Sequence, residues 1–331
     1  MAVHTDPLAE QRPWLDGENE FTVRVRQMTW ESDGVVSLDL VSDEGHVLPA
    51  WQPGAHIDLV LSASLVRQYS LCGSPADTTG YRVAVLREEQ SLGGSTFVHD
   101  RLRVGQQLRV VGPRNNFGLA SAESYLFIAG GIGITPILPM IAAAEEAGVP
   151  WRLLYGGARR VGMAFLGELD RWGDRITVFP EDEGPRMDLP TIVADLAPGE
   201  HIYACGPSPM LEELEELCDP LPGQVLHLER FMAKAREDTS ATDEEISVLC
   251  RASDVELSVP ADQTILEAME AAGISWPNSC REGICGSCEA VVCEGVPDHR
   301  DSLLSPEEQE AGETLMVCVS RAQTPRLVID A

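Results

Sequence analysis

The fold is decided by PNSCREGICGSC at residues 277–288, a cysteine-rich loop that is followed by LMVCVS at residues 315–320. The cysteines are spaced C-x4-C-x2-C-x29-C, so three thiols share one tight loop and the fourth comes from a distant apolar segment. Four thiolates in this arrangement suit a binuclear iron–sulfur cluster, in which each iron takes two of them. Zinc is the alternative, but zinc sites usually pair two C-x2-C knuckles, and this chain has one. The expected ligands are Cys280, Cys285, Cys288 and Cys318.

Residues 246–331, which contain this loop, resemble plant-type ferredoxins over their whole length. The resemblance implies an α+β domain of the β-grasp type that carries one electron at a time. Gly283 and Gly286 let the loop backbone bend closely and direct its N–H groups at the cluster. Cys293, beyond the loop, is expected to be a strand residue and not a ligand. By the resemblance, the cysteines hold the irons in pairs, Cys280 with Cys285 nearer solvent and Cys288 with Cys318 further inside.

The composition narrows the class of protein. A chain of 331 residues suggests two or three domains at roughly 100–200 residues each. With 53 Asp and Glu against 24 Lys and Arg, the net charge of −29 repels nucleic acid and anionic membranes and suits a basic protein partner. No apolar run reaches the ~18 residues of a membrane helix, and no signal peptide is visible at the start. We therefore expect a soluble, cytoplasmic monomer whose nine cysteines are not a disulfide set.

Strand and helix patterns divide the chain into successive domains. Short β-branched segments separated by turns predict an antiparallel β-barrel over residues 20–118. Strands and helices alternate over residues 119–232, which predicts a doubly wound parallel α/β sheet. The charged segment AKAREDTSATDEE at 233–245 lacks apolar periodicity and is expected to link this sheet to the domain at 246–331. The predicted fold class is therefore multidomain.

Two motifs in the barrel segment offer groups that suit a flavin. RQYSLCGSP at 67–75 supplies a cation, an aromatic ring and a hydroxyl, and SLGGSTFVHD at 91–100 is a glycine-rich turn that opens a helix. Free N–H groups at a helix start make a phosphate site. Each motif alone is weak, because an ordinary turn and a cross-strand Tyr use the same residues. The candidate residues are Arg67, Tyr69 and Ser70 in the first motif, and Gly93, Gly94, Ser95 and Thr96 in the second.

Two further motifs each end a predicted strand and begin a predicted helix. They are YLFIAGGIGITPILPM at 125–140 and YACGPSPM at 203–210. Ligands bind at the carboxyl ends of parallel strands in such sheets, so both loops are candidates for a nucleotide site. The first is not the G-x-G-x-x-G fingerprint of the usual dinucleotide fold. The candidate residues are Gly130, Gly131, Gly133, Thr135 and Pro136 in the first loop, and Cys205, Gly206, Pro207 and Met210 in the second.

In this order the four motifs resemble the ferredoxin–NADP reductase superfamily. The full order of barrel, nucleotide domain, linker and ferredoxin domain resembles the phthalate dioxygenase reductase family, which includes vanillate O-demethylase-type reductases. The resemblance covers about residues 20–331. It implies FMN, with FAD as the alternative, and places Arg67 at the flavin phosphate or ring, Tyr69 against the flavin and the Gly-Gly-Ser-Thr turn at the phosphate. Ser70 near the flavin N5 atom and Cys205 beside the nicotinamide C4 atom are then the catalytic residues, although a buried structural thiol is the alternative for Cys205.

The nicotinamide donor is less directly indicated. The resemblance favours NADH, with NADPH as the alternative. Arg159 and Arg160 follow the strand WRLLYGG, where arginines meet a ribose 2′-phosphate or simply begin a solvated helix. In relatives an aromatic residue near the end of the nucleotide domain stacks on the flavin, and Phe231 in LERFM at 228–232 stands there. Packing at the domain boundary is the alternative for Phe231.

These cofactors predict a function. Nicotinamide donates two electrons together as hydride, an iron–sulfur cluster takes one at a time, and a flavin converts between them. We expect an NADH-dependent oxidoreductase, the reductase component that passes electrons to a Rieske-type terminal oxygenase or O-demethylase. A haem-thiolate monooxygenase is the alternative partner. A redox sensor that keeps the cofactors without turning over is the alternative from another class.

Overall fold

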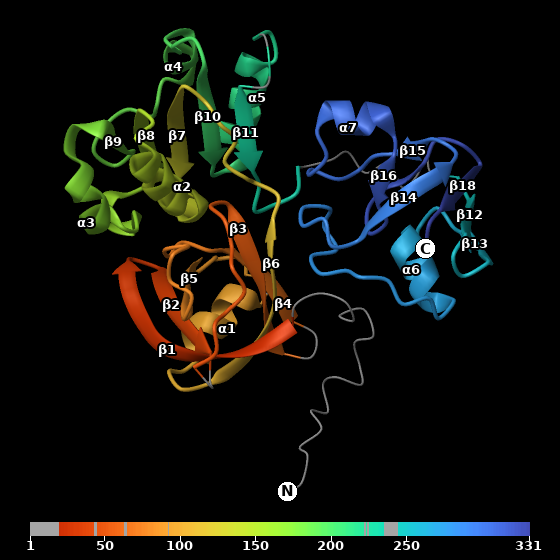
Figure 1. The fold of residues 1–331 in the computed structure, drawn as a ribbon. Coiled ribbons are helices and arrows are strands. Elements are labelled where there is room, and N and C mark those ends of the chain that lie inside the picture. The colour runs from red at the N-terminus through yellow and green to blue at the C-terminus, as the bar shows by residue number, and fades with distance from the viewer. Residues whose placement is uncertain are drawn as a thin grey trace, which may run out of the picture. The chain divides into compact units, whose positions relative to one another are not determined.

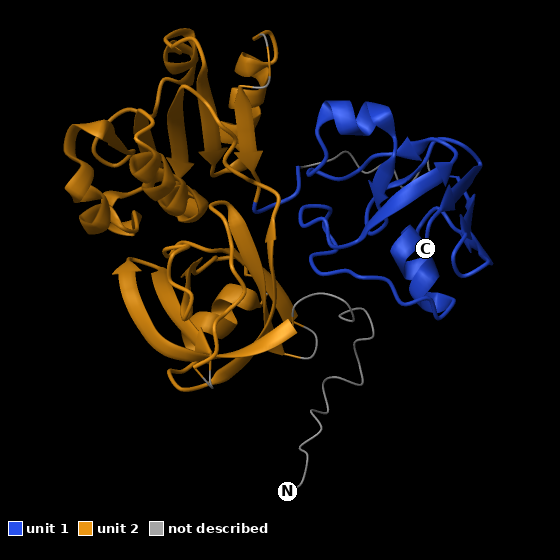
Figure 2. Cartoon of the chain, in the orientation of Figure 1, with its two compact units in different colours: residues 1–18, 231–331 blue, residues 19–230 orange. Residues whose placement is uncertain are grey.

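The computed structural model describes residues 20–42, 45–62, 65–91, 93–221, 223, 225–234 and 244–331. One compact unit spans residues 19–230 and another contains residues 231–331 (Figure 2). Each unit is described by itself below. Most of the predicted linker, residues 235–243, lies outside the described residues.

The larger unit begins with a six-stranded antiparallel sheet (Figure 1). Its elements are β1 (Glu20–Ser32), β2 (Val35–Ser42), β3 (Ala55–Ser62), β4 (Leu65–Ser70), β5 (Gly80–Leu86), α1 (Gly94–Asp100) and β6 (Gln107–Asn115). The strand order is β4-β3-β6-β1-β2-β5, and a bridge between Leu71 and Val83 joins the two ends, which closes the sheet into a barrel. Alternate residues of β3, such as Ile57 and Leu59, point into its apolar core.

A five-stranded parallel sheet with helices on both faces completes this unit. Its strands are β7 (Ser124–Gly130), β8 (Trp151–Gly157), β9 (Ile176–Pro180), β10 (Glu200–Cys205) and β11 (Leu226–Glu229). Its helices are α2 (Ile134–Ala147), α3 (Leu166–Leu169), α4 (Leu189–Ala194) and α5 (Ser208–Cys218), with short 3-10 turns η3 (Gly131–Gly133), η4 (Arg160–Gly162) and η5 (Asp170–Arg175). The order β11-β10-β7-β8-β9 reverses direction between β7 and β10, so the loops after these two strands meet at the position where such sheets bind ligands.

The smaller unit is built on a mixed sheet of order β13-β12-β18-β14-β16. Its elements are β12 (Ile246–Cys250), β13 (Val255–Val259), α6 (Ile265–Ala271), β14 (Glu289–Glu294), β15 (Pro297–Asp298), α7 (Pro306–Ala311), β16 (Thr314–Met316), β17 (Arg321–Ala322) and β18 (Arg326–Ile329). Thr264 caps α6 by accepting a hydrogen bond from the Glu267 backbone N–H, and the helix buries Leu266 and Met269 in the core of this unit. The cysteine loop lies between α6 and β14 in the chain.

The architecture confirms the predicted order of barrel, parallel sheet and ferredoxin-like α+β layer. It adds β4, which was predicted only as a flavin motif, and it places Cys293 within β14 as expected. The domain limits at residues 118 and 232 stay predictions, because contacts group residues 19–230 together. No helix within the described ranges is long and apolar enough to cross a membrane.

Candidate flavin, nucleotide and cluster sites

The four cysteines of the predicted cluster are gathered at one place in the smaller unit. The thiol of Cys280 interacts with those of Cys285 and Cys318, and Cys318 interacts with Cys288. Cys285, Cys288 and Cys318 are buried, whereas Cys280 is partly exposed. Among the described residues, no group of three or more His, Cys, Asp or Glu side chains is arranged so that it could hold a single metal ion. A binuclear cluster requires only two thiolates for each iron, so this donor set fits it.

The backbone of the loop explains why its sequence is rich in glycine. Gly283 and Gly286 adopt positive φ angles of 70° and 76°. A side chain at Gly283 would also come within 2.6 Å of Val319 Cγ2, so the loop closes tightly at this point. The tight bend turns backbone N–H groups toward sulfur, since the N–H of Glu282 donates to Cys280 Sγ at 3.3 Å. Such N–H groups stabilise the charge of a bound cluster.

The two flavin motifs are in contact within the barrel. Gly94 lies directly against the side chain of Arg67, where an added Cβ would be 2.4 Å from Arg67 Cγ. Tyr69 packs at the edge of the barrel core, and burial raises the pKa of its hydroxyl to about 12. Arg67 on β4 therefore lies beside the glycine turn, and the joint binding of a flavin by the two motifs stays a prediction.

The hydroxyl groups of the glycine turn differ in their roles. Ser91 Oγ accepts hydrogen bonds from the N–H groups of Gly93 and Thr96. Ser95 Oγ donates to Ser91 Oγ at 2.9 Å and accepts from the N–H of Glu88, so it holds the turn together from a buried position. Ser91 opens the quoted motif but was not among the predicted site residues, and the signal for it was a serine two positions before the glycine pair.

The two nucleotide loops pack against one another at the switch point of the parallel sheet. A Cβ at Gly133 would lie 2.2 Å from the Cys205 carbonyl oxygen, and one at Gly130 would lie 2.5 Å from Pro207 Cδ. A Cβ at Gly206 would meet Met210 Cε at 2.6 Å. Glycine is therefore required where the two loops come into close contact. Buried Thr135 donates to the carbonyl oxygen of Ile132 and fixes the start of α2, which Pro136 continues.

A polar pair that the motifs did not reveal joins the barrel to the parallel sheet. Ser70 Oγ donates a hydrogen bond to Glu229 Oε2 at 3.2 Å. Glu229 ends β11 and is paired in register with Cys205 on β10. Burial raises the pKa of Glu229 to about 8. The pKa of the Cys205 thiol is raised well above its usual value by burial and then by Glu229, so this thiol stays protonated.

The structure does not bring every predicted residue into this group. Arg159 is exposed, and Arg160 is already paired with Glu183, whose carboxylate oxygens both lie 2.8 Å from Arg160 Nε. The backbone N–H of Arg160 donates to Asp182. Phe231 is 39% exposed and belongs to the smaller unit. Its proposed stacking on the flavin stays a prediction.

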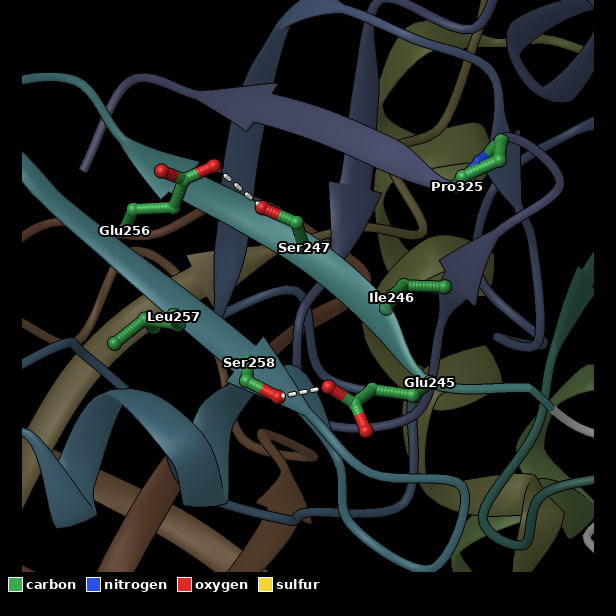
Figure 3. A pocket seen from close by; sticks show the side chains of 7 residues that line it. All are labelled: Glu245, Ile246, Ser247, Glu256, Leu257, Ser258 and Pro325. Carbon is green, nitrogen blue, oxygen red and sulfur yellow. Dashed lines mark hydrogen bonds between the residues drawn. The ribbon is translucent and has the colours of Figure 1, made fainter.

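An open groove of about 490 Å³ lies on the smaller unit over β12 and β13 (Figure 3). Ser247 donates to Glu256 at 2.7 Å and Ser258 donates to Glu245, so the polar side chains of the groove bond one another. None of the predicted cofactor residues lines it. The groove is therefore a surface feature of the smaller unit that involves none of the predicted cofactor residues.

Comparison with known proteins agrees with this geometry. Residues 248–323 match the family described as a 2Fe-2S iron-sulfur cluster binding domain. Phenoxybenzoate dioxygenase subunit beta of Ectopseudomonas oleovorans is 42% identical, and the match covers 93% of this chain and 97% of that protein. A solved structure of phthalate dioxygenase reductase is 31% identical, with a TM-score of 0.70, and the match covers 97% of this chain and 100% of that one.

A longer protein also contains this arrangement. An intact type IV self-sufficient cytochrome P450 monooxygenase is 41% identical with a TM-score of 0.89, over 94% of this chain and 41% of its own. The matches to phenoxybenzoate dioxygenase subunit beta and to phthalate dioxygenase reductase each run over nearly the whole length of both proteins. The chain therefore belongs to the phthalate dioxygenase reductase family, and it is an oxidoreductase of the reductase type that serves oxygenase systems.

Proposed function

We propose that the chain oxidises NADH, passes the electrons through FMN to its [2Fe–2S] cluster, and delivers them singly to a separate terminal oxygenase. The observation that carries this proposal is the hydrogen bond from Ser70 to Glu229, because it brings the flavin strand and the nucleotide sheet to one place. A bound flavin supplies the conversion of a two-electron hydride into single electrons. The residues of the chain must hold the cofactors, orient them and exclude water.

In this proposal, different residues of the barrel hold different parts of the flavin. Arg67, beside the glycine turn, neutralises a phosphate or the flavin ring, and Tyr69 provides the apolar surface that covers one side. The backbone N–H of Gly94 completes the phosphate contacts, with Gly93 allowing the turn through its φ of 94°. In this proposal Ser95 supports the turn from behind, because its hydroxyl is bonded within it.

The nucleotide loops present the nicotinamide. Gly130, Gly131 and Gly133 allow the dinucleotide to approach the backbone closely, next to the N-terminus of α2. Cys205 offers a small, neutral surface at the nicotinamide, because its pKa is raised by burial. Glu229 is paired in register with Cys205, and with Ser70 it supplies polar groups at the proposed site of hydride transfer.

NADH is the preferred donor in this proposal. A 2′-phosphate needs a free cation, and the guanidinium of Arg160 is held by Glu183 while its N–H is held by Asp182. These two carboxylates repel an added phosphate. Of the two arginines, Arg159 is then the one that remains a candidate to contact the ribose of the adenosine.

The partner that we propose first is a Rieske-type oxygenase, because the full-length relative is named as a subunit of a dioxygenase. A haem-thiolate monooxygenase is the second candidate, since a cytochrome P450 monooxygenase contains a region 41% identical to this chain. Residues 245–331 contain 16 acidic and 5 basic residues, which favours a basic docking surface on either partner. The structure describes all nine cysteines and none of them forms a disulfide bond, which suits a reducing cytoplasm. We propose a monomer.

An anaerobic absorbance titration of the purified protein, with its flavin identified after release, tests the electron pathway. NADH should bleach the flavin bands and the cluster bands together. Bleaching of flavin without any cluster band would contradict the assignment of the four cysteines. Bleaching by NADPH alone would contradict the choice of donor.

Turnover separates a reductase from a redox sensor. A reductase should reduce cytochrome c rapidly with NADH, and the rate should depend on an intact cluster. A protein that binds both cofactors and reduces no acceptor would instead support the sensor, and the proposal would then fail.

A further inference from the structure

The loop that follows β8 contacts the barrel through its backbone. It carries Arg159, the arginine that we propose for the ribose of the adenosine, and the short turn η4. The N–H of Asp33, at the turn between β1 and β2, donates to the carbonyl oxygen of Val161 at 2.9 Å. The hydroxyl of buried Ser32 donates to the carbonyl oxygen of Gly162 at 3.1 Å. Two hydrogen bonds therefore attach this loop to the barrel, although the loop belongs to the parallel sheet.

One arginine strengthens this attachment from the side of the barrel. Arg82 lies on β5, and its Nη2 atom is 2.8 Å from Glu31 Oε1 on β1. Its Nη1 atom is 2.9 Å from Glu168 Oε2 on α3, the helix that directly follows the loop. A planar guanidinium presents donors on both sides of its fork, so it can bond two carboxylates at once. All three side chains are part-buried, so salt screens these pairs less than it screens fully exposed ones.

The residue that joins the loop to α3 has an unfavourable backbone conformation. Phe165 has a φ of 63°, in the left-handed region that bulky side chains rarely adopt. Its side chain is buried in an apolar cluster that also contains Val35 and Ala84 of the barrel. The guanidinium of Arg82 lies 4.8 Å from the centre of the Phe165 ring, within the range of a cation–π contact. Packing of this kind compensates for backbone strain, so the conformation of the loop depends on its contact with the barrel.

The same loop is also joined to the glycine-rich loop after β7. The hydroxyl of Tyr155 on β8 lies 3.1 Å from the carbonyl oxygen of Gly131 and 3.3 Å from that of Ala164, so it can donate to either. Tyr155 is completely buried, which excludes water from these bonds. The loop after β8 is therefore fixed on one side to the barrel, which carries the flavin motifs. On the other side it is fixed to the loop that we propose to hold the dinucleotide.

NADH has two ends that must be bound at the same time. Resting on the proposed function, we infer that Arg82 is a positioning residue for NADH. It holds the loop after β8 against the barrel, so that Arg159 binds the adenosine half while the nicotinamide reaches the flavin beside Cys205. Contacts with a remote part of a substrate help the reaction only when both parts reach their sites together. Arg82 acts through the loop, because its guanidinium is bonded to the two carboxylates.

A shortened donor separates positioning from general stability. Reduced nicotinamide mononucleotide carries the same hydride as NADH but lacks the adenosine half. In the holoenzyme, with cytochrome c as acceptor, Arg82→Met should lower kcat/KM for NADH about tenfold, through a higher KM at unchanged kcat. The same variant should keep the native kcat/KM for the shortened donor, because that donor does not reach the loop. Arg87→Met is the matched control, since Arg87 pairs with Asp100 inside the barrel.

A second variant tests the same bond without disturbing the barrel. Glu168→Gln removes the charge on α3 and leaves Arg82 paired with Glu31. It should also raise the KM for NADH alone, and the double variant with Arg82→Met should be no worse than Arg82→Met. Arg82→Lys should restore part of the native KM, because an ammonium group can still pair with one carboxylate. Flavin content and melting temperature show whether each variant is folded, and Glu168→Gln decides if Arg82→Met does not take up flavin.

The possible failures are distinguishable. Equal losses of kcat/KM for the two donors, in either variant that binds flavin, overturn the positioning role, because Arg82 would then act on the flavin or on the fold. A native KM for NADH in both variants also overturns it. Failure of NADH to bleach the flavin in the native protein would instead overturn the proposed function.

Discussion

Ser70 at the end of β4 donates a hydrogen bond of 3.2 Å to Glu229 at the end of β11, across 159 positions of the chain. The bond links the strand that carries the flavin motif to the sheet that carries the nucleotide loops. Burial raises the pKa of Glu229 to about 8, so the carboxyl group is largely protonated at neutral pH. The contact thus joins the two sites, and burial keeps the carboxyl group between them largely uncharged.

The raised pKa of Glu229 predicts a pH-dependent stability. The folded chain binds this proton more tightly than the unfolded chain, whose Glu has a pKa of 4.5. Stability should therefore fall as the pH rises from about 4.5 through about 8. Urea unfolding at pH 6 and pH 8.5 should show a larger loss for the native protein than for Glu229→Gln. An equal loss in both proteins would mean that Glu229 titrates normally.

Because the two nucleotide loops are in close contact, we predict that a side chain added at a glycine between them destabilises the protein. Gly133→Ala places a Cβ 2.2 Å from the Cys205 carbonyl oxygen. The backbones must separate, which should lower the free energy of unfolding by ~1–3 kcal/mol and raise the Kd for NADH. Gly167→Ala is the control, because no heavy atom lies within 4 Å of its added Cβ. Thermal denaturation and equilibrium binding of NADH measure both effects, and identical behaviour of the two variants would contradict the packing.

The four thiols predict which cysteines matter for iron. Cys318→Ser should lose the cluster, because the second iron would keep only one of its two thiolates. Cys293→Ser is the matched control, since Cys293 lies in β14 and outside the ligand loop. Iron content and visible absorbance of the purified proteins report the result. Loss of iron in the control, or its retention in Cys318→Ser, would refute the ligand assignment.

The pairing of Arg160 with Glu183 predicts that the protein prefers NADH to NADPH as its electron donor. Glu183→Gln frees the guanidinium of Arg160, which then attracts a 2′-phosphate. The ratio of kcat/KM for NADPH to that for NADH should rise roughly fivefold, the equivalent of ~1 kcal/mol for one surface charge interaction. Glu181→Gln is the control, because Glu181 pairs with Arg186 instead. An unchanged ratio would remove Arg160 from the nucleotide site.

The acidic smaller unit predicts a salt-sensitive partnership. Residues 245–331 contain 16 acidic and 5 basic residues, so association with a basic oxygenase surface should be fast and should weaken as salt screens the charges. Association rates measured from about 20 to 500 mM NaCl should fall steadily. A rate that does not depend on salt would show that docking rests on apolar contacts.

Much of the site could be predicted from the sequence, because each motif consists of residues that are close together in the chain. The spacing of the cysteines identifies the cluster, since three ligands must come from one loop. The glycines of the nucleotide loop and of the turn at Gly94 are readable for the same reason, because close backbone approach excludes other residues. The alternation of strands and helices likewise predicted the parallel sheet before any contact was known.

The tertiary structure decided what depends on segments far apart in the chain. Glu229 stands in an ordinary strand end, and only the pairing of β11 with β10 and the approach of β4 make it a site residue. The same pairing brings His227 to His201, and the end of β9 brings Glu183 to Arg160. Motif spacing encodes backbone geometry over a few residues, whereas a pKa or a charge pair depends on neighbours that only folding brings together.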